Sequence, residues 1–337
     1  MSGKKTTILF FFILLCLILT LFTGCLSRSE SAENGSVSGN VSDFAHVSST
    51  YISPVSDAPR VMNTTRIIAI SAGGTHSLAL KSDGTVLAWG ANWYRQSTVP
   101  QNCTNITEIS AGWHHNLALK NDGTVVAWGD THEGECDVPD DMSDVRAVSA
   151  GAMHNLALKN DGTVVAWGDN GAGQGNFPQR LTHYKAISGR SRHSLGLKED
   201  GTLDTFGSNL YGQRNVPANL HTISAIAAGS GFSLALKDDG TVLAWGADDR
   251  GQVSVPANLT NVTAIAAGDE HSLALMSNGT VVAWGRNQYG QCDVPKNLTD
   301  VIAISAGTGH NLALKRDGTV VAWGDNQYGQ CNVPRSL

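Results

Sequence analysis

The sequence predicts an all-β protein, a seven-bladed β-propeller whose blades are four-stranded and antiparallel. An aromatic-Gly pair recurs seven times at a constant spacing of 39 residues, from Trp89 to Trp323. A fixed period of this length indicates a repeat architecture. Each repeat contains short apolar segments separated by Gly, Asn, Asp and Pro, which is typical of strands and turns.

The segment before each aromatic-Gly pair reads Thr-Val-Val-Ala-Trp in most repeats. Because it is apolar at successive positions, it predicts a strand that is buried on both faces. Sheets that cover one another in this way close most simply into a ring, which leaves only short protected edges. An open solenoid is the alternative, but neither end shows the polar capping repeat that an open stack needs.

The last repeat shows where the strands of each blade are expected. We predict strands at Val301 to Ala306, His310 to Lys315, Thr319 to Trp323 and roughly Gln330 to Val333. An Asp-Gly or Asn-Gly pair separates the second and third segments in all seven repeats and supplies the positive φ of a tight hairpin. A calcium site is not expected there, because one carboxylate per turn is far short of about six to eight oxygen ligands.

Residues 1–24 are predicted to be an export signal. Lys4 and Lys5 precede an apolar run of 15 residues, Ile8 to Phe22. Such a run is shorter than the roughly 20 residues of a membrane-spanning helix but matches a signal-peptide core. The following residues resemble a lipoprotein box, which implies lipidation of Cys25; an ordinary signal segment is the alternative. Either way we expect an extracytoplasmic protein, attached to a membrane only through its N-terminal anchor.

Residues 25–60 are expected to form a flexible tether, because this segment is rich in serine and poor in large apolar residues, and so cannot bury a core. The propeller is assigned to residues 61–337. The stretch from Thr65 to Leu337 holds 273 residues, which is seven times 39.

The net charge argues against one class of partner, and the cysteine positions argue against disulfides. The formal net charge of −6 argues against nucleic acid, whose binding depends on Lys and Arg that neutralise phosphates. Cys136, Cys292 and Cys331 occupy one phase of the repeat and should lie too far apart for a disulfide, which needs Cα atoms within about 7 Å. We therefore expect packed thiols, with a Cys103–Cys136 bond between neighbouring blades as the open alternative.

The recurring motifs resemble the regulator of chromosome condensation repeat over residues 63–337. They are His-Ser/Asn-Leu-Ala-Leu-Lys, Asp-Gly-Thr-Val and Trp-Gly-x-Asn-x-x-Gly-Gln. The resemblance implies a seven-bladed propeller, in the short insertion-free style of the secreted propellers that inhibit β-lactamases and bind through loop aromatics. Nuclear members of the family exchange guanine nucleotides through a wedge inserted in the propeller. The unbroken 39-residue spacing and the export signal argue against that activity here.

The first and third turns of each blade are predicted to lie on one face of the ring. They vary between repeats, whereas the second and fourth turns are nearly constant, so the variable face is the predicted binding surface. Aromatic, Met and Arg side chains, which protein interfaces favour, occur among them. The candidate binding residues are Trp93, Tyr94, Trp113, His114, His132, Met153, Arg190, Arg192, Tyr211, Asp269, Glu270, Tyr289 and Tyr328.

A histidine recurs at one phase of six repeats, with Phe232 in its place in the fifth. We expect a structural role, in which the imidazole of each blade hydrogen-bonds to neighbouring backbone. Equivalent residues on packed sheets should be on the order of 8 Å apart, whereas zinc needs nitrogens at about 2 Å, so no metal or other cofactor is predicted. The histidines are His76, His115, His154, His193, His271 and His310.

The fourth repeat departs most from the others. Asp204 stands where the other six repeats have Val or Leu. Because an unpaired buried charge is costly, we expect Asp204 to pair with Arg190 or Arg192, or to be exposed at a loosened blade edge.

These observations predict a binding module, tethered to the cell surface, that recognises a protein partner through the variable face. A carbohydrate-binding protein and a structural envelope protein are the alternatives. A lyase-type enzyme is disfavoured and no catalytic residue is assigned, because His, Asp and Lys recur in phase as scaffold residues do. The nearest unmatched group is His132 with Glu133 and Glu135. We expect a monomer that binds an unidentified protein, with a glycan as a further possibility and no nucleic acid.

Overall fold

The structure is a computed structural model and describes residues 65–178, 182–218 and 220–335. The chain divides into two units, residues 1–43 and 44–337, and the described residues all belong to the second. The predicted signal segment, the lipidation site Cys25 and the serine-rich tether lie outside the described residues. Within the described ranges, no helix is long and apolar enough to cross a membrane.

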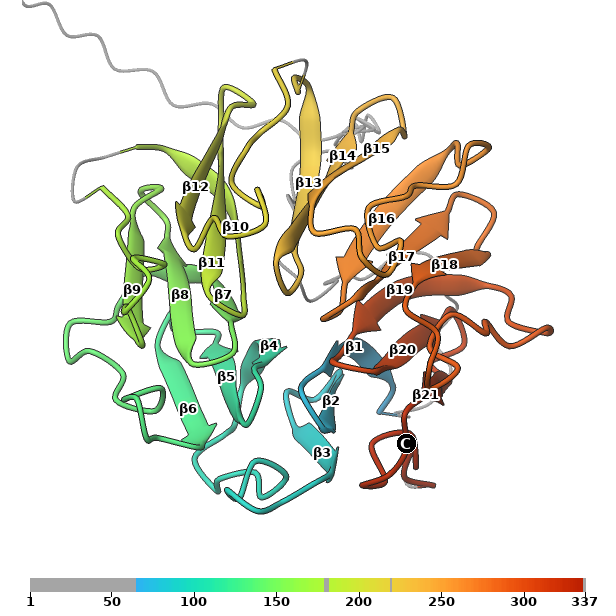
Figure 1. Cartoon of the computed structure of the whole chain (residues 1–337). Coiled ribbons are helices and arrows are strands. Elements are labelled where there is room, and N and C mark those ends of the chain that lie inside the picture. Colours follow the sequence, from blue (N-terminus) through green and yellow to red (C-terminus); the bar gives the residue numbers. More distant parts are fainter. Residues whose placement is uncertain (1–64, 179–181, 219, 336–337) are drawn as a thin grey trace, which may run out of the picture. The chain divides into compact units, whose positions relative to one another are not determined.

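Across the described ranges, 21 strands form seven antiparallel sheets of three strands each, and every sheet uses three consecutive strands. We number the sheets as blades 1–7 in chain order; Figure 1 shows them following one another around a ring. The first strands are β1 (Ile67–Ala72), β4 (Ile106–Ala111), β7 (Val145–Ala150), β10 (Tyr184–Arg190), β13 (Ile223–Ala228), β16 (Val262–Ala267) and β19 (Val301–Ala306). The second strands are β2 (His76–Lys81), β5 (His115–Lys120), β8 (His154–Lys159), β11 (His193–Lys198), β14 (Phe232–Lys237), β17 (His271–Met276) and β20 (His310–Lys315). The third strands are β3 (Val86–Gly90), β6 (Val125–Gly129), β9 (Val164–Gly168), β12 (Leu203–Gly207), β15 (Val242–Gly246), β18 (Val281–Gly285) and β21 (Val320–Gly324).

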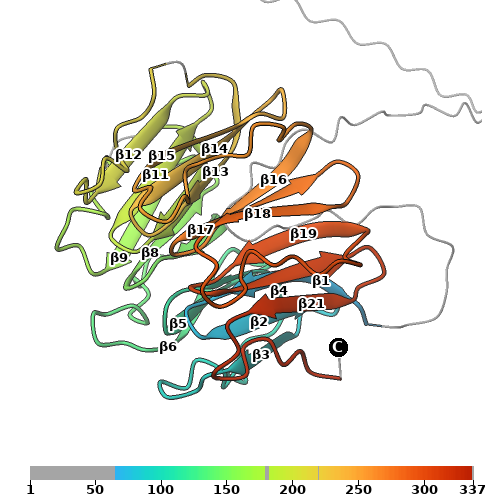
Figure 2. The same ribbon diagram turned by 45° about the vertical axis from the view of Figure 1, so that its right-hand side comes forward.

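The ring closes between blade 7 and blade 1. Strand β1 packs against β19 and β20, as both views of the ribbon show (Figures 1 and 2). Ile70 and Trp89 share a buried cluster with Leu312, and the Trp89 indole donates to the carbonyl of Gln330 at 2.9 Å. The predicted closed ring is therefore confirmed, and it closes without exchanging a strand between the two ends of the propeller.

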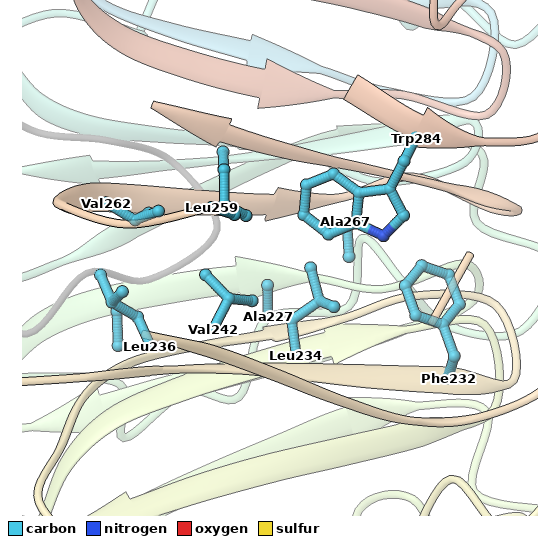
Figure 3. Packing of buried hydrophobic residues seen from close by; sticks show 11 residues of the cluster. Ala227, Phe232, Leu234, Leu236, Val242, Leu259, Val262, Ala267 and Trp284 are labelled. Carbon is cyan, nitrogen blue, oxygen red and sulfur yellow. The ribbon is translucent and has the colours of Figure 1, made fainter. Parts of the chain in front are cut away.

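The core lies between blades rather than at the centre of each one. The middle strand of each blade is buried at its first five residues. In the seam between blades 5 and 6, Phe232 and Leu234 face Ala267 and Trp284 (Figure 3). Burying one such side chain contributes roughly 1.5–3 kcal/mol, so each blade depends on both neighbours for its stability.

The prediction of four strands per blade is wrong, because the described blades have three. The fourth segment, Gln330 to Val333 in blade 7, begins in a turn and continues without forming a strand. Its polar groups are used elsewhere: the Gln330 carbonyl accepts from Ser77 and Trp89 of blade 1, and the Cys331 N–H donates to the Asn326 side chain. Pro334 follows and has no N–H to offer. The segment joins two blades instead of adding a strand to its own.

The Asp-Gly turns have a local physical reason. In blade 1, Gly84 has a φ of +79°, a conformation that glycine adopts without steric cost. The Thr85 N–H and hydroxyl both donate to one Asp83 carboxylate oxygen, at 3.0 and 2.6 Å. These two hydrogen bonds lower the pKa of Asp83. In the Asp-Gly-Thr sequence, the Asp carboxylate therefore accepts the hydrogen bonds that close the turn. Gly supplies the positive φ, and Thr supplies the two donors.

The recurring histidines bond to side chains, which corrects the prediction that they bond to backbone. Each Nε2 meets an Asn or Ser on the middle strand of the next blade, as with His76 and Asn116 at 2.7 Å. The Asn116 amide in turn donates to the Gln96 carbonyl. The other pairs are His115–Asn155, His154–Ser194, His193–Ser233, His271–Asn311 and His310–Ser77.

This arrangement fixes the protonation state of the histidine ring. Because the Asn116 amide nitrogen is already donating, its oxygen faces His76 and accepts from Nε2–H. The Nδ1 atoms of all six histidines are buried without a hydrogen-bond partner in the described protein. Burial lowers the pKa of His76 to about 4 and that of His310 to about 3. The six rings are therefore neutral.

The predicted pairing of Asp204 with Arg190 or Arg192 is wrong. Asp204 forms an ion pair with Lys198 at 2.8 Å and accepts from the Tyr184 hydroxyl at 2.7 Å. Its side chain is 30% exposed, while β12 pairs regularly with β11. The other expectation, exposure at a loosened blade edge, is therefore met only in part. Arg190 bonds elsewhere, as described below.

The four described cysteines are free thiols, so the Cys103–Cys136 bond is not formed. Cys136, Cys292 and Cys331 each donate from Sγ to the carbonyl oxygen six residues earlier. Burial raises the pKa of Cys136 to about 12. The prediction of packed thiols is confirmed for this phase of the repeat.

Candidate binding surface

The first and third turns of the blades lie together on one face of the ring, which we call the loop face. A Cβ built on Gly231, in a first turn, would lie 2.9 Å from the Tyr211 ring, in a third turn. One on Gly309 would lie 3.2 Å from Tyr289. In each pair the third turn of one blade contacts the first turn of the next.

Six rings on the loop face form two contacting groups across blades 7, 1 and 2, which meet at the chain neighbours Trp93 and Tyr94. Together we call them the aromatic cluster. Trp93 meets Tyr328 edge-on, with centroids 4.5 Å apart. Tyr94 lies 5.1 Å from His114 and 5.8 Å from His132, and Trp113 stacks on His114. Trp93 is 59% exposed, and Tyr94, Trp113 and Tyr328 are about 40% exposed. The cluster is therefore a large ring surface open to solvent. Its members are Trp93, Tyr94, Trp113, His114, His132 and Tyr328.

Hydrogen bonds within the loops hold the aromatic cluster in place. The Tyr328 N–H donates to the Gln330 side-chain oxygen at 2.9 Å, and the Tyr94 N–H donates to Gln96 in the same way. The carbonyls of the same two glutamines accept from the tryptophan of the next blade. One glutamine therefore fixes a loop to its own blade and to the neighbouring blade.

Buried side-chain polar atoms without a protein partner gather in the blades that carry the aromatic cluster. Apart from the six histidine Nδ1 atoms above, five such side-chain atoms occur in the described residues, and all five belong to blades 7, 1 and 2. Because buried polar groups are nearly always hydrogen-bonded, this sector differs from the rest of the ring. The atoms are Thr75 Oγ1, Gln96 Nε2, His114 Nδ1, Thr308 Oγ1 and Gln330 Nε2.

Carboxylates border the aromatic cluster on blade 2. Asp130 pairs with His132, and its hydrogen bond and charge raise the pKa of His132. Glu135 is buried and takes the place of the glutamine found in the other six repeats; burial raises its pKa. Within the described residues, no three His, Cys, Asp or Glu side chains come together as a metal-binding group.

Arg190 closes the axis of the ring at the loop face. It occupies the phase that is glycine in the other six repeats, and its side chain reaches from blade 4 to Asp269 of blade 6, at 3.0 Å. It also donates to the Ala306 carbonyl of blade 7 at 3.2 Å. A small pocket of about 60 Å³ remains beside it, lined by Arg190, Asp269, Trp113 and several Gly, Ala and Ser residues. Arg190 and Asp269 are therefore engaged with each other.

The remaining predicted site residues belong to blades 3, 4 and 6, outside the three blades that carry the aromatic cluster. Arg192 and Tyr211 are exposed on blade 4, and Glu270 pairs with Arg286 beside Tyr289 on blade 6. Met153, on blade 3, is half-buried.

Sequence reasoning missed Leu210, Asp130 and Asp325 on the loop face. Leu210 is 85% exposed. Asp130 and Asp325 follow their Trp-Gly pairs directly, at a position that is Arg286 in blade 6. The change of charge at one fixed phase is the signal that would have found both aspartates.

Solved structures similar to this chain confirm the fold. They include the ectodomain of the receptor kinase CR4 from Physcomitrella patens, with 19% identity and a TM-score of 0.64 over 77% of this chain and 74% of that one. The CRINKLY WD40 ectodomain of the Arabidopsis thaliana receptor kinase ACR4 has 18% identity and a TM-score of 0.63 over 77% and 98%. Human WBSCR16 has 18% identity and a TM-score of 0.60 over 76% and 88%. At these identities the likeness concerns the fold alone.

A comparison with curated protein sequences found no match. The family model of the regulator of chromosome condensation (RCC1) repeat, in contrast, matches seven segments that together make up more than half of the chain. They are residues 67–96, 106–135, 145–174, 186–213, 223–252, 262–291 and 301–330. The match covers all seven blades, and the chain belongs to the RCC1 repeat family.

Proposed function

We propose that this protein is an interaction module that binds a protein partner through the aromatic cluster of its loop face. The observation that carries the proposal is the group of exposed rings, together with the unpartnered buried polar atoms of the same three blades. Large aromatic side chains that are held rigidly lose little entropy on binding and dominate the energy of protein interfaces. The monotonous scaffold positions the rings and takes no part in the recognition itself.

We further propose that the propeller acts outside the cytoplasm, attached through a lipid on Cys25 and the serine-rich tether. This rests on the sequence of residues 1–60 alone. A tether of this composition would leave the loop face free to meet a partner.

The test compares capture of surface proteins by the wild type and by the double variant Trp93→Ala/Trp113→Ala. We expect the variant to lose a partner that the wild type retains, because alanine removes the two largest exposed rings of the aromatic cluster. Removal of interface aromatics typically weakens binding by about 2 kcal/mol or more each. The readout is mass spectrometry of the captured proteins, followed by titration of the purified partner.

The matched control is Leu210→Ala/Tyr211→Ala, which removes two exposed side chains from blade 4 on the same face. It should bind as the wild type does, and both variants should melt at the wild-type temperature. Equal capture by all three proteins would contradict the proposed role of the aromatic cluster.

A further inference from the structure

In blade 6, the ring of Tyr289 on the loop face contacts a cation that belongs to the same chain. The Arg286 guanidinium lies 5.6 Å from the centre of the Tyr289 ring and pairs with the Glu270 carboxylate. A cation above an aromatic ring is attracted to the negative face of its π system. Tyr289 therefore already has a cationic partner, and that cation already has its counter-ion.

Blade 7 has the same loop but the opposite charge. The Tyr289 and Tyr328 N–H groups donate to equivalent glutamine side chains, at 2.8 and 2.9 Å, so the two loops are built alike. At the phase of Arg286 stands Asp325, and at the phase of Glu270 stands Gly309. The Tyr328 ring, with Trp93 against it, thus has a carboxylate in its loop where Tyr289 has a cation.

The charge of the surrounding loops is mainly negative. The first and third turns of blades 7, 1 and 2 contain one guanidinium, Arg95. Against it stand four carboxylates outside the core and the buried Glu135; His132, when protonated, adds a positive charge beside Asp130. The lysines of these blades come at the ends of the second strands, before the Asp-Gly turns, away from the loop face. The four carboxylates are Asp130, Glu133, Asp137 and Asp325.

We propose that the aromatic cluster binds a basic segment of its protein partner, an extended stretch that carries arginine or lysine side chains. The inference rests on the proposed function and specifies the chemistry of the partner. A basic side chain over Tyr328 and Trp93 takes the place that Arg286 takes in blade 6, with Asp325 as its counter-ion. A second basic side chain lies between Tyr94 and the Asp130–Glu133 carboxylates. Cation–π contacts and charge-assisted hydrogen bonds act together at both positions.

The experiment titrates the propeller with three probes by calorimetry at low and at moderate salt. The probes are an alternating Gly-Arg octapeptide, the same peptide with citrulline for arginine, and a neutral cello-oligosaccharide. Citrulline keeps the shape of arginine and removes its charge. We expect the Gly-Arg peptide to bind at least about tenfold more tightly than its citrulline counterpart, and salt to weaken its binding.

Variants assign the effect to the cluster. The double variant Glu133→Gln/Asp325→Asn should bind the Gly-Arg peptide about tenfold more weakly, because it removes two negative charges while leaving hydrogen-bonding oxygens in place. Arg95→Gln should strengthen binding, since it removes the one guanidinium of these turns. The matched control Asp249→Asn, an exposed carboxylate of blade 5 on the same face, should leave the affinity unchanged.

Three outcomes would overturn the inference. Equal binding of the arginine and citrulline peptides, lost in Trp93→Ala/Tyr328→Ala, would keep the cluster as a protein-binding surface and reject its preference for cations. Binding of the oligosaccharide alone would make the surface a glycan site. No binding of any probe would reject the basic segment, while the capture experiment would still decide the proposed function.

Discussion

At the scale of single residues, the glycine before each variable pair is set by the neighbouring histidine. A Cβ built on Gly151 would lie 2.4 Å from the His154 ring, and one on Gly73 would lie 2.7 Å from the Gly112 carbonyl of the next blade. The histidine ring therefore leaves no room for a Cβ at this position, so the glycine and the histidine pack as one unit. In blade 4, where Arg190 replaces the glycine, β10 is one residue longer and Ser191 has a positive φ of 48°.

The variant Gly151→Ala tests this close contact. We expect it to lower the free energy of unfolding by about 1–3 kcal/mol, because the added methyl group forces the buried His154 ring to move. The matched control is Gly171→Ala, where the added Cβ would meet only the end of the Asp169 side chain. Chemical denaturation of both variants measures the difference, and equal midpoints would contradict a packing role for the glycine.

At the scale of the blade, the departures of the fourth repeat form one packing group. Tyr184 replaces Ile or Val, Gly196 replaces Ala, and Asp204 replaces Val or Leu. A Cβ on Gly196 would lie 2.7 Å from the Tyr184 ring, so the tyrosine requires the glycine. Asp204 accepts from the tyrosine hydroxyl and is itself neutralised by Lys198. The three substitutions therefore depend on one another and form one packing group.

Restoring the pattern of the other blades should reveal this coupling. Gly196→Ala alone should destabilise the protein by about 1–3 kcal/mol through the clash with Tyr184. Asp204→Val alone should also destabilise it, by about 1–2 kcal/mol, because the buried tyrosine loses an acceptor. The triple variant Tyr184→Ile/Gly196→Ala/Asp204→Val should recover most of the wild-type stability. Additive losses in thermal denaturation would show that the sites are independent.

The sequence predicted the strands well, because their spacing and turns are local properties. The first two strands of the last repeat match the prediction, and the third is shifted by one residue. The fourth strand failed because the partners of the Gln330 carbonyl belong to another blade. Candidate rings such as Trp93 and Tyr328 were found from composition. Their contact across the closing seam depends on which repeats meet, and a periodic sequence does not encode that locally.

At the scale of the whole molecule, the histidine contacts make the ring sensitive to acid. Burial lowers the pKa of His76, His115, His154 and His271 to about 4, and that of His193 and His310 to about 3. In the unfolded chain each histidine titrates near its ordinary value of 6.5. Below that pH the histidines of the unfolded chain bind protons, whereas the buried histidines of the folded chain stay neutral. The free energy of unfolding therefore has its full value above about pH 6.5. It decreases as the pH falls from there toward about 4.

Acid should open the ring in a single steep transition. Each proton taken up by the unfolded state costs the fold about 1.4 kcal/mol per pH unit, and six histidines act together. The combined loss reaches roughly 10 kcal/mol by pH 5, comparable to the whole stability of a typical domain. Circular dichroism between pH 7 and 4 should therefore show unfolding between about pH 6 and 5, above the range in which most carboxylates titrate.

The variant His193→Phe tests the source of the acid transition. Phe232 occupies the same phase in blade 5, and the Ser272 hydroxyl of blade 6 donates to the Gln252 carbonyl. Ser233 donates to the Gln213 carbonyl in the same way, and this bond does not depend on His193. The variant should therefore fold at pH 7. Its unfolding should take up about one proton fewer, so that the free energy of unfolding depends less steeply on pH. His132→Ala, which removes an exposed imidazole, should leave the midpoint unchanged. A transition that follows His132 instead of His193 would assign the acid sensitivity to the loop face and not to the contacts between blades.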